Sequence, residues 1–316
     1  MHTPNILVIN QLSDRHISAI TNSVPGCSII SCDLADAEKY IDTAEIIVAW
    51  GWMDLQELYL KAPKLRWVHA LSAGVEKMLF PEMISSSTLL TNSRGIHGIP
   101  MSEHVISMIL AFTRGLNVFI KQQQQRVWKR TALEEIHEKT IGIIGLGSIG
   151  REIAKRAKGL GMRVVASKRE MTTELFVDTL YTSNQIEEVL AVSDFVVVTL
   201  PETKQTQGLF TLNLFKLMKP SAYFINVARG SIVKEDDLSI ALSQGIIKGA
   251  ALDVFENEPL PESSPLWDVP NVIITPHIAA ISPHYLDRAM KLFCENLACY
   301  CGGQEMVNII DKTKGY

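Results

Sequence analysis

The stretch IIGLGSIGREIAKRAKGLGMRVVASKRE, residues 143–170, decides the fold of this chain. It opens on an apolar run that stops at a glycine, and further glycines follow at short, regular intervals. An amphipathic run with apolar residues at helical spacing comes next, and a second apolar run precedes a pair of cations. This order predicts a strand, a tight glycine turn, a helix and a second strand.

The glycines of this turn form the pattern G-x-G-x-x-G with Gly145, Gly147 and Gly150. In a strand–turn–helix context the pattern indicates a dinucleotide site: the first glycine allows the turn, the second lets backbone approach a pyrophosphate, and the third allows close packing. Ser148 and Ile149 open the helix, whose N-terminus favours phosphate. The alternative is a glycine-rich turn that binds nothing.

Cations stand where an NAD site usually carries an acid, about twenty residues after the first glycine. The chain has Ser167, Lys168 and Arg169 there. A hydroxyl and two cations suit the 2′-phosphate of NADP, which a carboxylate would repel. We therefore expect NADP(H) as the preferred cofactor, with NAD(H) possible. In the alternative interpretation the cations form a solvated strand end, and Glu170 serves as the acid one position late.

The whole chain has 316 residues, 47% of them hydrophobic, and a formal net charge of −4. Its length suits two domains, and a charge this small gives no reason to expect a nucleic-acid partner. It contains no apolar run long enough for a membrane span, and its start, MHTPNILVIN, does not read as a signal peptide. Five cysteines at loose spacing fit reduced thiols, and no metal site is expected. We expect a cytoplasmic protein.

Apolar runs alternate with amphipathic ones along the chain, which predicts an α/β fold with parallel sheets. The predicted strands lie at 6–9, 45–50, 66–70, 88–92, 194–201, 221–229, 247–255 and 271–277. The predicted helices lie at 14–23 with Ser13 as cap, at 101–129 as one long helix capped by Ser102, and at 211–218, 235–244 and 282–300.

Three downstream segments add a resemblance: FINVARGSIV (224–233), ALDVFENEPLP (251–261) and SPLWDVPNVIITPHIAA (264–280). Together with the glycine turn they closely resemble the D-isomer-specific 2-hydroxyacid dehydrogenase family, in the short form of the glyoxylate/hydroxypyruvate reductases. The resemblance implies a Rossmann-type doubly wound sheet for the cofactor over residues 99–283. It also implies a smaller flavodoxin-like substrate domain over 1–98 and 284–316.

The resemblance assigns the chemistry to Arg229, Glu258 and His277. Arg229 matches the arginine that binds the substrate carboxylate and polarises the 2-carbonyl, and His277 matches the proton donor that Glu258 orients. The residue types fit a 2-oxo acid, because a guanidinium fork suits a carboxylate and a histidine donates near neutral pH. Taken singly, each could be a strand-end or loop residue of no catalytic use. Together, at the ends of successive strands, they would fall where open α/β sheets bind ligands.

Further contacts follow from the same resemblance. Ser72, Ala73 and Gly74 match the loop whose backbone N–H groups hold the substrate carboxylate. Asp253 matches the acid that accepts from the nicotinamide amide. The remaining residues match those that line the adenosine, the ribose and the nicotinamide ring: Leu200, Pro201, Thr206, Val227, Ala228 and Ala279.

The predicted activity is therefore the reduction of a small 2-oxo acid to the D-2-hydroxy acid. A phosphoglycerate dehydrogenase-like NAD enzyme and a dinucleotide-sensing binding module stay open as alternatives. A homodimer is expected, because the region near Trp128 meets the partner subunit in the family. Trp50 and Trp52 could border the substrate pocket or be ordinary aromatics.

Overall fold

A computed structural model describes residues His2–Lys314, which divide into two compact units. Unit 1 comprises the chain up to Ile96 and again from Ser282, and unit 2 comprises His97–Ile281. Unit 1 is the smaller of the two. Both boundaries lie two residues before those expected from the sequence, at 98 and 283.

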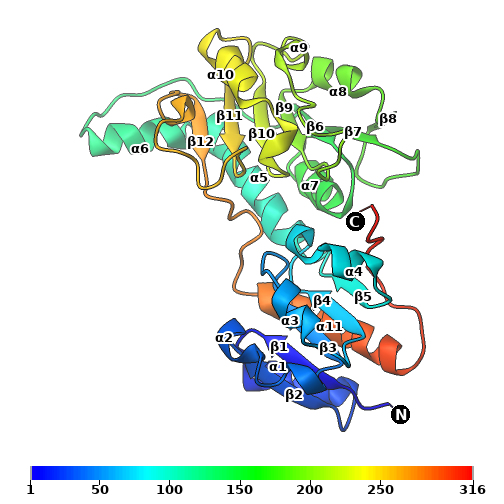
Figure 1. The fold of residues 1–316 in the computed structure, drawn as a ribbon. Helices are drawn as coiled ribbons and strands as arrows, with labels where there is room; N and C mark the ends of the chain where they lie inside the picture. Colours follow the sequence, from blue (N-terminus) through cyan, green and yellow to red (C-terminus); the bar gives the residue numbers. More distant parts are fainter. Residues whose placement is uncertain (1, 315–316) are drawn as a thin grey trace. The chain divides into compact units, whose positions relative to one another are not determined.

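Unit 1 is built on a five-stranded sheet in which every pairing is parallel, in the order β2-β1-β3-β4-β5. This is the flavodoxin-like order, as predicted. Side chains alternate along the strands, so helices α1 and α11 cover one face and α2, α3 and α4 the other (Figure 1). The bounds are β1 Asn5–Ile9, α1 Asp14–Ser23, β2 Ser28–Cys32, α2 Leu34–Ala37, β3 Ile46–Ala49, α3 Gln56–Leu60, β4 Trp67–Ala70, α4 Pro81–Ser85, β5 Leu89–Asn92 and α11 Tyr285–Cys301.

Unit 2 is built on a seven-stranded parallel sheet in the order β12-β11-β10-β9-β6-β7-β8. The chain starts in the middle at β6, moves out to β8 and returns through β9, which is the doubly wound order predicted for dinucleotide binding. Helices α5 and α7 cover one face, and α8, α9 and α10 cover the other. The bounds are α5 Gly98–Thr113, α6 Leu116–Gln124, β6 Thr140–Ile144, α7 Ser148–Gly159, β7 Arg163–Lys168, β8 Thr179–Thr182, α8 Ile186–Val192, β9 Phe195–Val198, α9 Leu212–Phe215, β10 Tyr223–Asn226, α10 Glu235–Ser243, β11 Gly249–Leu252 and β12 Val272–Ile274.

The single long helix predicted over 101–129 is wrong. The chain forms two helices, α5 and α6, that are bent by 66°. Gly115 lies between them with a φ of +67°, a backbone conformation that ends a right-handed helix. Ser102 is not a cap, because α5 begins at Gly98 and the Ser102 hydroxyl donates to the Ile99 carbonyl inside the helix.

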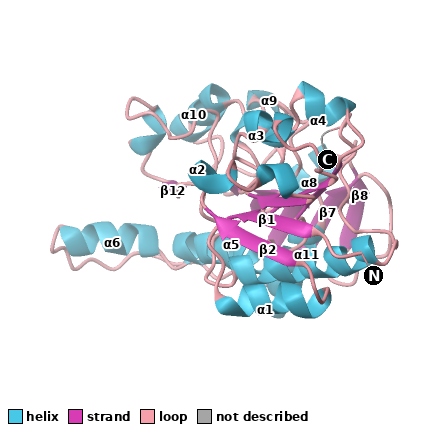
Figure 2. Ribbon diagram, turned by 60° about the horizontal axis from the view of Figure 1, so that its bottom comes forward, coloured by secondary structure: helices cyan, strands magenta, loops and turns pink. Residues whose placement is uncertain are grey.

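Helix α6 extends away from the sheet of unit 2 (Figure 2) and has no buried residue. Leu116, Ile120 and Trp128 are at least half exposed on α6 and the segment after it. Among the described helices none is long and apolar enough to span a membrane by itself, and only the bent pair α5–α6 meets that test jointly.

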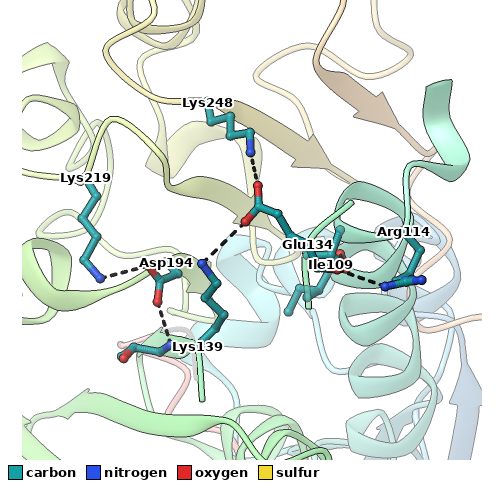
Figure 3. Close-up of polar contacts among 9 residues, drawn as sticks. Ile109, Arg114, Glu134, Lys139, Asp194, Lys219 and Lys248 are labelled. Carbon is teal, nitrogen blue, oxygen red and sulfur yellow. Dashed lines mark hydrogen bonds and ion pairs between the residues drawn. The ribbon is translucent and has the colours of Figure 1, made fainter. Parts of the chain in front are cut away.

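Ion pairs fasten the amino ends of the strands in unit 2 (Figure 3). Asp194, just before β9, accepts from the Thr140 N–H of β6 at 2.8 Å and from the Lys219 ammonium at 2.9 Å. Glu134 accepts from Lys248, which precedes β11, and its carboxylate lies 3.6 Å from the Lys139 ammonium. These contacts tie the segment after α6 to the edge of the sheet that lies opposite the ends discussed below.

The glycine turn between β6 and α7 has the geometry that its sequence predicts. Gly145 has a φ of +99°, and a Cβ there would lie 2.9 Å from a methyl of Leu200. A Cβ on Gly150 would lie 3.1 Å from the Gly145 carbonyl oxygen, so this glycine allows the helix to pack closely. A Cβ on Gly147 would have nothing within 4 Å, which leaves open space in front of the helix N-terminus.

We predict that Gly145→Ala lowers the free energy of unfolding by about 1–3 kcal/mol, because alanine is strained at this φ and meets Leu200. Gly159→Ala is the matched control in α7. The added Cβ would have no neighbour within 4 Å, so this variant should raise the free energy of unfolding by about 0.5–1 kcal/mol. Chemical denaturation checks both. Equal stability of Gly145→Ala and the unmodified protein would contradict the strained turn.

Candidate active site

The three predicted catalytic residues follow three neighbouring strands of unit 2. Arg229 follows β10, Glu258 follows β11 and His277 follows β12. Asn226 pairs with Leu252, and Leu252 pairs with Ile274, so these parallel strands end level with one another. The structure therefore brings the guanidinium, the carboxylate and the imidazole to the same edge of one sheet, where open α/β sheets bind ligands.

His277 and Glu258 form a direct pair. The imidazole Nδ1 lies 2.7 Å from Glu258 Oε2, and Glu258 Oε1 accepts the Phe255 N–H at 3.0 Å. The carboxylate is thus held from behind by its own loop and fixes the ring from one side. Half of the His277 side chain is exposed, and its second nitrogen, Nε2, has no hydrogen-bond partner among the described residues.

The loop that carries Arg229 is held by its neighbours. The buried side chain of Asn226 accepts the Ala228 N–H and donates to the Arg229 carbonyl, each at 3.0 Å. A Cβ on Gly230 would lie 1.8 Å from the Phe255 carbonyl carbon, so only glycine lets this loop touch the loop that leads to Glu258. Sequence analysis missed Asn226, although an amide at a buried strand end is a recognisable signal.

Asp253 directly follows β11 and is 1% exposed. Its Oδ1 accepts the Thr275 hydroxyl at 2.6 Å and the Ile278 N–H at 3.0 Å, and its Oδ2 accepts the Ala279 N–H at 2.9 Å. The Asp253 carbonyl accepts the His277 N–H at 2.8 Å. This one residue holds the turn on both sides of His277, whose φ of +52° is unusual for histidine.

Two histidines missed by sequence analysis adjoin these residues. His104 on α5 lies 3.1 Å from the Thr275 hydroxyl and 3.7 Å from Asp253 Oδ1 through its Nε2. His97, at the start of α5, is buried, and burial together with the nearby Arg229 charge lowers its pKa to about 4. A neutral His97 adds no positive charge beside Arg229 at neutral pH.

The residues predicted for the cofactor surround the glycine turn and the neighbouring strand ends. Gly147 and Ser148 are exposed at the start of α7, where the first N–H groups of a helix have no partner within it. Leu200 packs on Gly145, and the Thr206 hydroxyl donates to the Pro201 carbonyl at 2.7 Å. The remaining predicted residues are partly or fully buried next to these ends: Ile149, Gly150, Val227, Ala228 and Ala279.

At the end of β7, Ser167 is 2% exposed, and its carbonyl accepts the N–H groups of Gly145 and Leu146. Its position thus fixes the glycine turn. Arg169 is exposed, and the Lys168 ammonium lies 3.0 Å from Glu174 Oε1.

The predicted substrate loop of unit 1 follows β4. The Ser72 hydroxyl accepts the Gly51 N–H at 2.9 Å and donates to the Gly74 carbonyl at 2.8 Å. The Ala73 carbonyl accepts from the Asn92 amide at 2.6 Å. Among the described residues, no acceptor faces the N–H groups of Ala73 and Gly74. Trp50 packs on Tyr285 and donates to Asn10, whereas Trp52 is largely exposed.

Comparisons with known proteins agree with this geometry. The family model "D-isomer specific 2-hydroxyacid dehydrogenase, NAD binding domain" matches residues 106–279. A glyoxylate/hydroxypyruvate reductase A from Photorhabdus laumondii is 32% identical over 306 residues, covering 95% of each chain.

Two solved structures are similar over nearly the whole chain. A D-isomer-specific 2-hydroxyacid dehydrogenase family protein from Aeromonas salmonicida has a TM-score of 0.90 and 36% identity, covering 98% of this chain and all of that one. An NADPH-dependent glyoxylate/hydroxypyruvate reductase from Sinorhizobium meliloti, solved with NADP and sulfate, has a TM-score of 0.84 and 28% identity. The match covers 99% of this chain and all of that one.

The fold and the site define a dinucleotide-binding α/β oxidoreductase. The chain belongs to the D-isomer-specific 2-hydroxyacid dehydrogenase family. Membership confirms the predicted family, fold and enzyme class, and with them a nicotinamide dinucleotide as cofactor.

We predict that Asp253→Asn lowers kcat by about 10- to 100-fold, because an amide cannot accept from all three donors and the His277 turn shifts. The free energy of unfolding should also fall by about 1–3 kcal/mol. Exposed Asp268→Asn is the control and should change neither quantity. A loss confined to the KM for the nicotinamide cofactor would contradict this role and favour contact with the nicotinamide amide.

Proposed function

We propose that the protein reduces small 2-oxo acids of the glyoxylate and hydroxypyruvate type to D-2-hydroxy acids, with NADP(H) as the preferred cofactor. The observation that carries this proposal is the His277–Glu258 pair at the same sheet edge as Arg229. Two of the similar proteins named above are glyoxylate/hydroxypyruvate reductases, and one of these two was solved with NADP.

Arg229 binds the substrate in this proposal. Its planar guanidinium matches the carboxylate of a 2-oxo acid, and its charge stabilises the negative charge that grows on the 2-carbonyl oxygen. The contacts of Asn226 and Gly230 keep the arginine at the strand end. In unit 1, the N–H groups of Ala73 and Gly74 donate to no acceptor among the described residues, and the family resemblance assigns them to a substrate carboxylate.

His277 supplies the proton in this proposal. Glu258 engages Nδ1 and orients the ring, so that Nε2 donates to the carbonyl oxygen. The open space at Gly147 and the exposed start of α7 fit the pyrophosphate of a dinucleotide, and Lys168 with Arg169 fits a 2′-phosphate. When bound, the cofactor supplies the hydride.

A panel of initial rates tests this function. NADPH and NADH oxidation are followed with glyoxylate, hydroxypyruvate, pyruvate and bulkier 2-oxo acids. We expect the highest kcat/KM with NADPH and one of the first two acids. Turnover with NADH alone would contradict the NADP(H) preference, and binding of both cofactors without turnover would favour a dinucleotide-sensing module.

We predict that Arg229→Ala and His277→Ala each lower kcat/KM by about 100-fold or more, since each removes a group that acts on the reacting carbonyl. Glu258→Gln should lower kcat, because the imidazole loses the carboxylate that orients it. Exposed His137→Ala is the control. Near-unmodified turnover in the Arg229 or His277 variant would overturn the mechanism.

We also propose a homodimer in which α6 contributes to the interface. Its apolar side chains Leu116 and Ile120, with the following Trp128, are exposed on an extension that carries no buried residue. Large apolar side chains that are exposed close together in the chain are typical of protein interfaces.

We predict that Ile120→Asp shifts the protein from dimer to monomer in sedimentation velocity, because it places a charge in the apolar surface. Gln124→Asp, an equal charge change at an exposed position of the same helix, should leave the dimer intact. A monomeric unmodified protein, or a dimer that survives Ile120→Asp, would contradict this interface.

A further inference from the structure

Glu174 lies in the loop after β7 and is bound by cations on two elements. Its carboxylate accepts from Arg151 twice, at 2.8 Å from Nε and 2.7 Å from Nη2. The same carboxylate accepts from the Lys168 ammonium at 3.0 Å and from the Thr172 hydroxyl at 2.9 Å. Its side chain is only 9% exposed.

These two cations stand beside the place of the cofactor's adenosine ribose. Arg151 belongs to the first turn of α7, where its N–H donates to the Gly147 carbonyl at 3.0 Å. Lys168 is the last residue of β7. In doubly wound folds the pyrophosphate binds at the first helix, and the ribose hydroxyls lie at the end of the second strand. The acid that the sequence lacks at this strand end is thus supplied by the following loop.

We propose that Glu174 is a specificity-determining residue for the cofactor, an inference that rests on the proposed NADP(H) site. Its carboxylate pairs with the Lys168 ammonium and the Arg151 guanidinium, which would otherwise be available to bind a 2′-phosphate. The protein therefore binds NADP(H) more weakly, relative to NAD(H), than its cations alone would allow.

Electrostatics gives the direction of the effect. A 2′-phosphate at Lys168 places a second anion next to Glu174, and like charges at this range repel. The ribose of NAD(H) carries hydroxyls there, and a carboxylate readily accepts hydrogen bonds from them. Glu174 stays ionised throughout the usual pH range, because its hydrogen bonds, that from Arg151 first, lower its pKa to about 2.

Glu174→Gln tests the proposal, since glutamine keeps the shape and removes the charge. The probes are 2′,5′-ADP and 5′-AMP, which share adenosine and differ in the 2′-phosphate, and titration calorimetry measures their Kd. We expect Glu174→Gln to tighten 2′,5′-ADP by about fivefold and to leave 5′-AMP within about twofold. In a Lys168→Gln background the gain should shrink, because one of the released cations is absent.

Asp178→Asn is the matched control. Asp178 closes the same loop and pairs with Lys158 of α7 at 2.9 Å, but its other partner, the Val164 N–H, lies near the opposite end of β7. This variant should leave the ratio of the two Kd values unchanged. Glu174→Ser, also uncharged, repeats the test if the glutamine variant does not fold.

The outcomes separate this inference from the proposed function. An unchanged Kd ratio in Glu174→Gln, or a ratio shifted toward 5′-AMP, would show that Glu174 only fastens the loop and would overturn the inference while leaving the NADP(H) site standing. Failure of the unmodified protein to bind either nucleotide would overturn the cofactor site and this inference together.

Discussion

Parallel strand pairing in unit 2 is the constraint on which the site depends. Every pairing in the order β12-β11-β10-β9-β6-β7-β8 is parallel, so each connection after a strand leaves from the same edge of the sheet. The glycine turn and the three catalytic candidates follow strands and Lys168 ends one, so they share that edge of the sheet. The opposite edge carries the ion pairs of Glu134 and Asp194, which hold the amino ends of the strands together.

The carboxylates of Asp253, Glu258 and Glu174 in unit 2 all accept hydrogen bonds from the protein itself, but their partners differ. Asp253 is buried and gives its oxygens to the turn around His277. Glu258 keeps one oxygen for its own loop and gives the other to the imidazole. Glu174 pairs with two cations beside the glycine turn. Burial and local donors, more than residue type, set the role of each carboxylate.

Much of the site could be predicted because strongly local signals encode it. Gly145 and Gly150 are specified by a turn that excludes a Cβ, and the arginine, glutamate and histidine stand in recognisable segments directly after apolar runs. The prediction of one long helix over 101–129 was wrong because the apolar periodicity continues across Gly115, although the backbone turns there. The partners Asn226, His104 and Glu174 escaped notice, since their significance lies in contacts with residues distant in sequence.

The family, the alternation of strands and helices, and the order of the chemical groups along the chain could all be inferred from the sequence alone. Hydrophobic periodicity and tight turns depend on a few neighbouring residues, so both can be recognised in the sequence alone. The burial of Asp253 under the His277 turn became visible only in the folded chain, as did the contact of a loop glutamate with the cations near the end of β7. These contacts depend on distances between residues far apart in the chain and on burial, and local sequence predicts neither quantity.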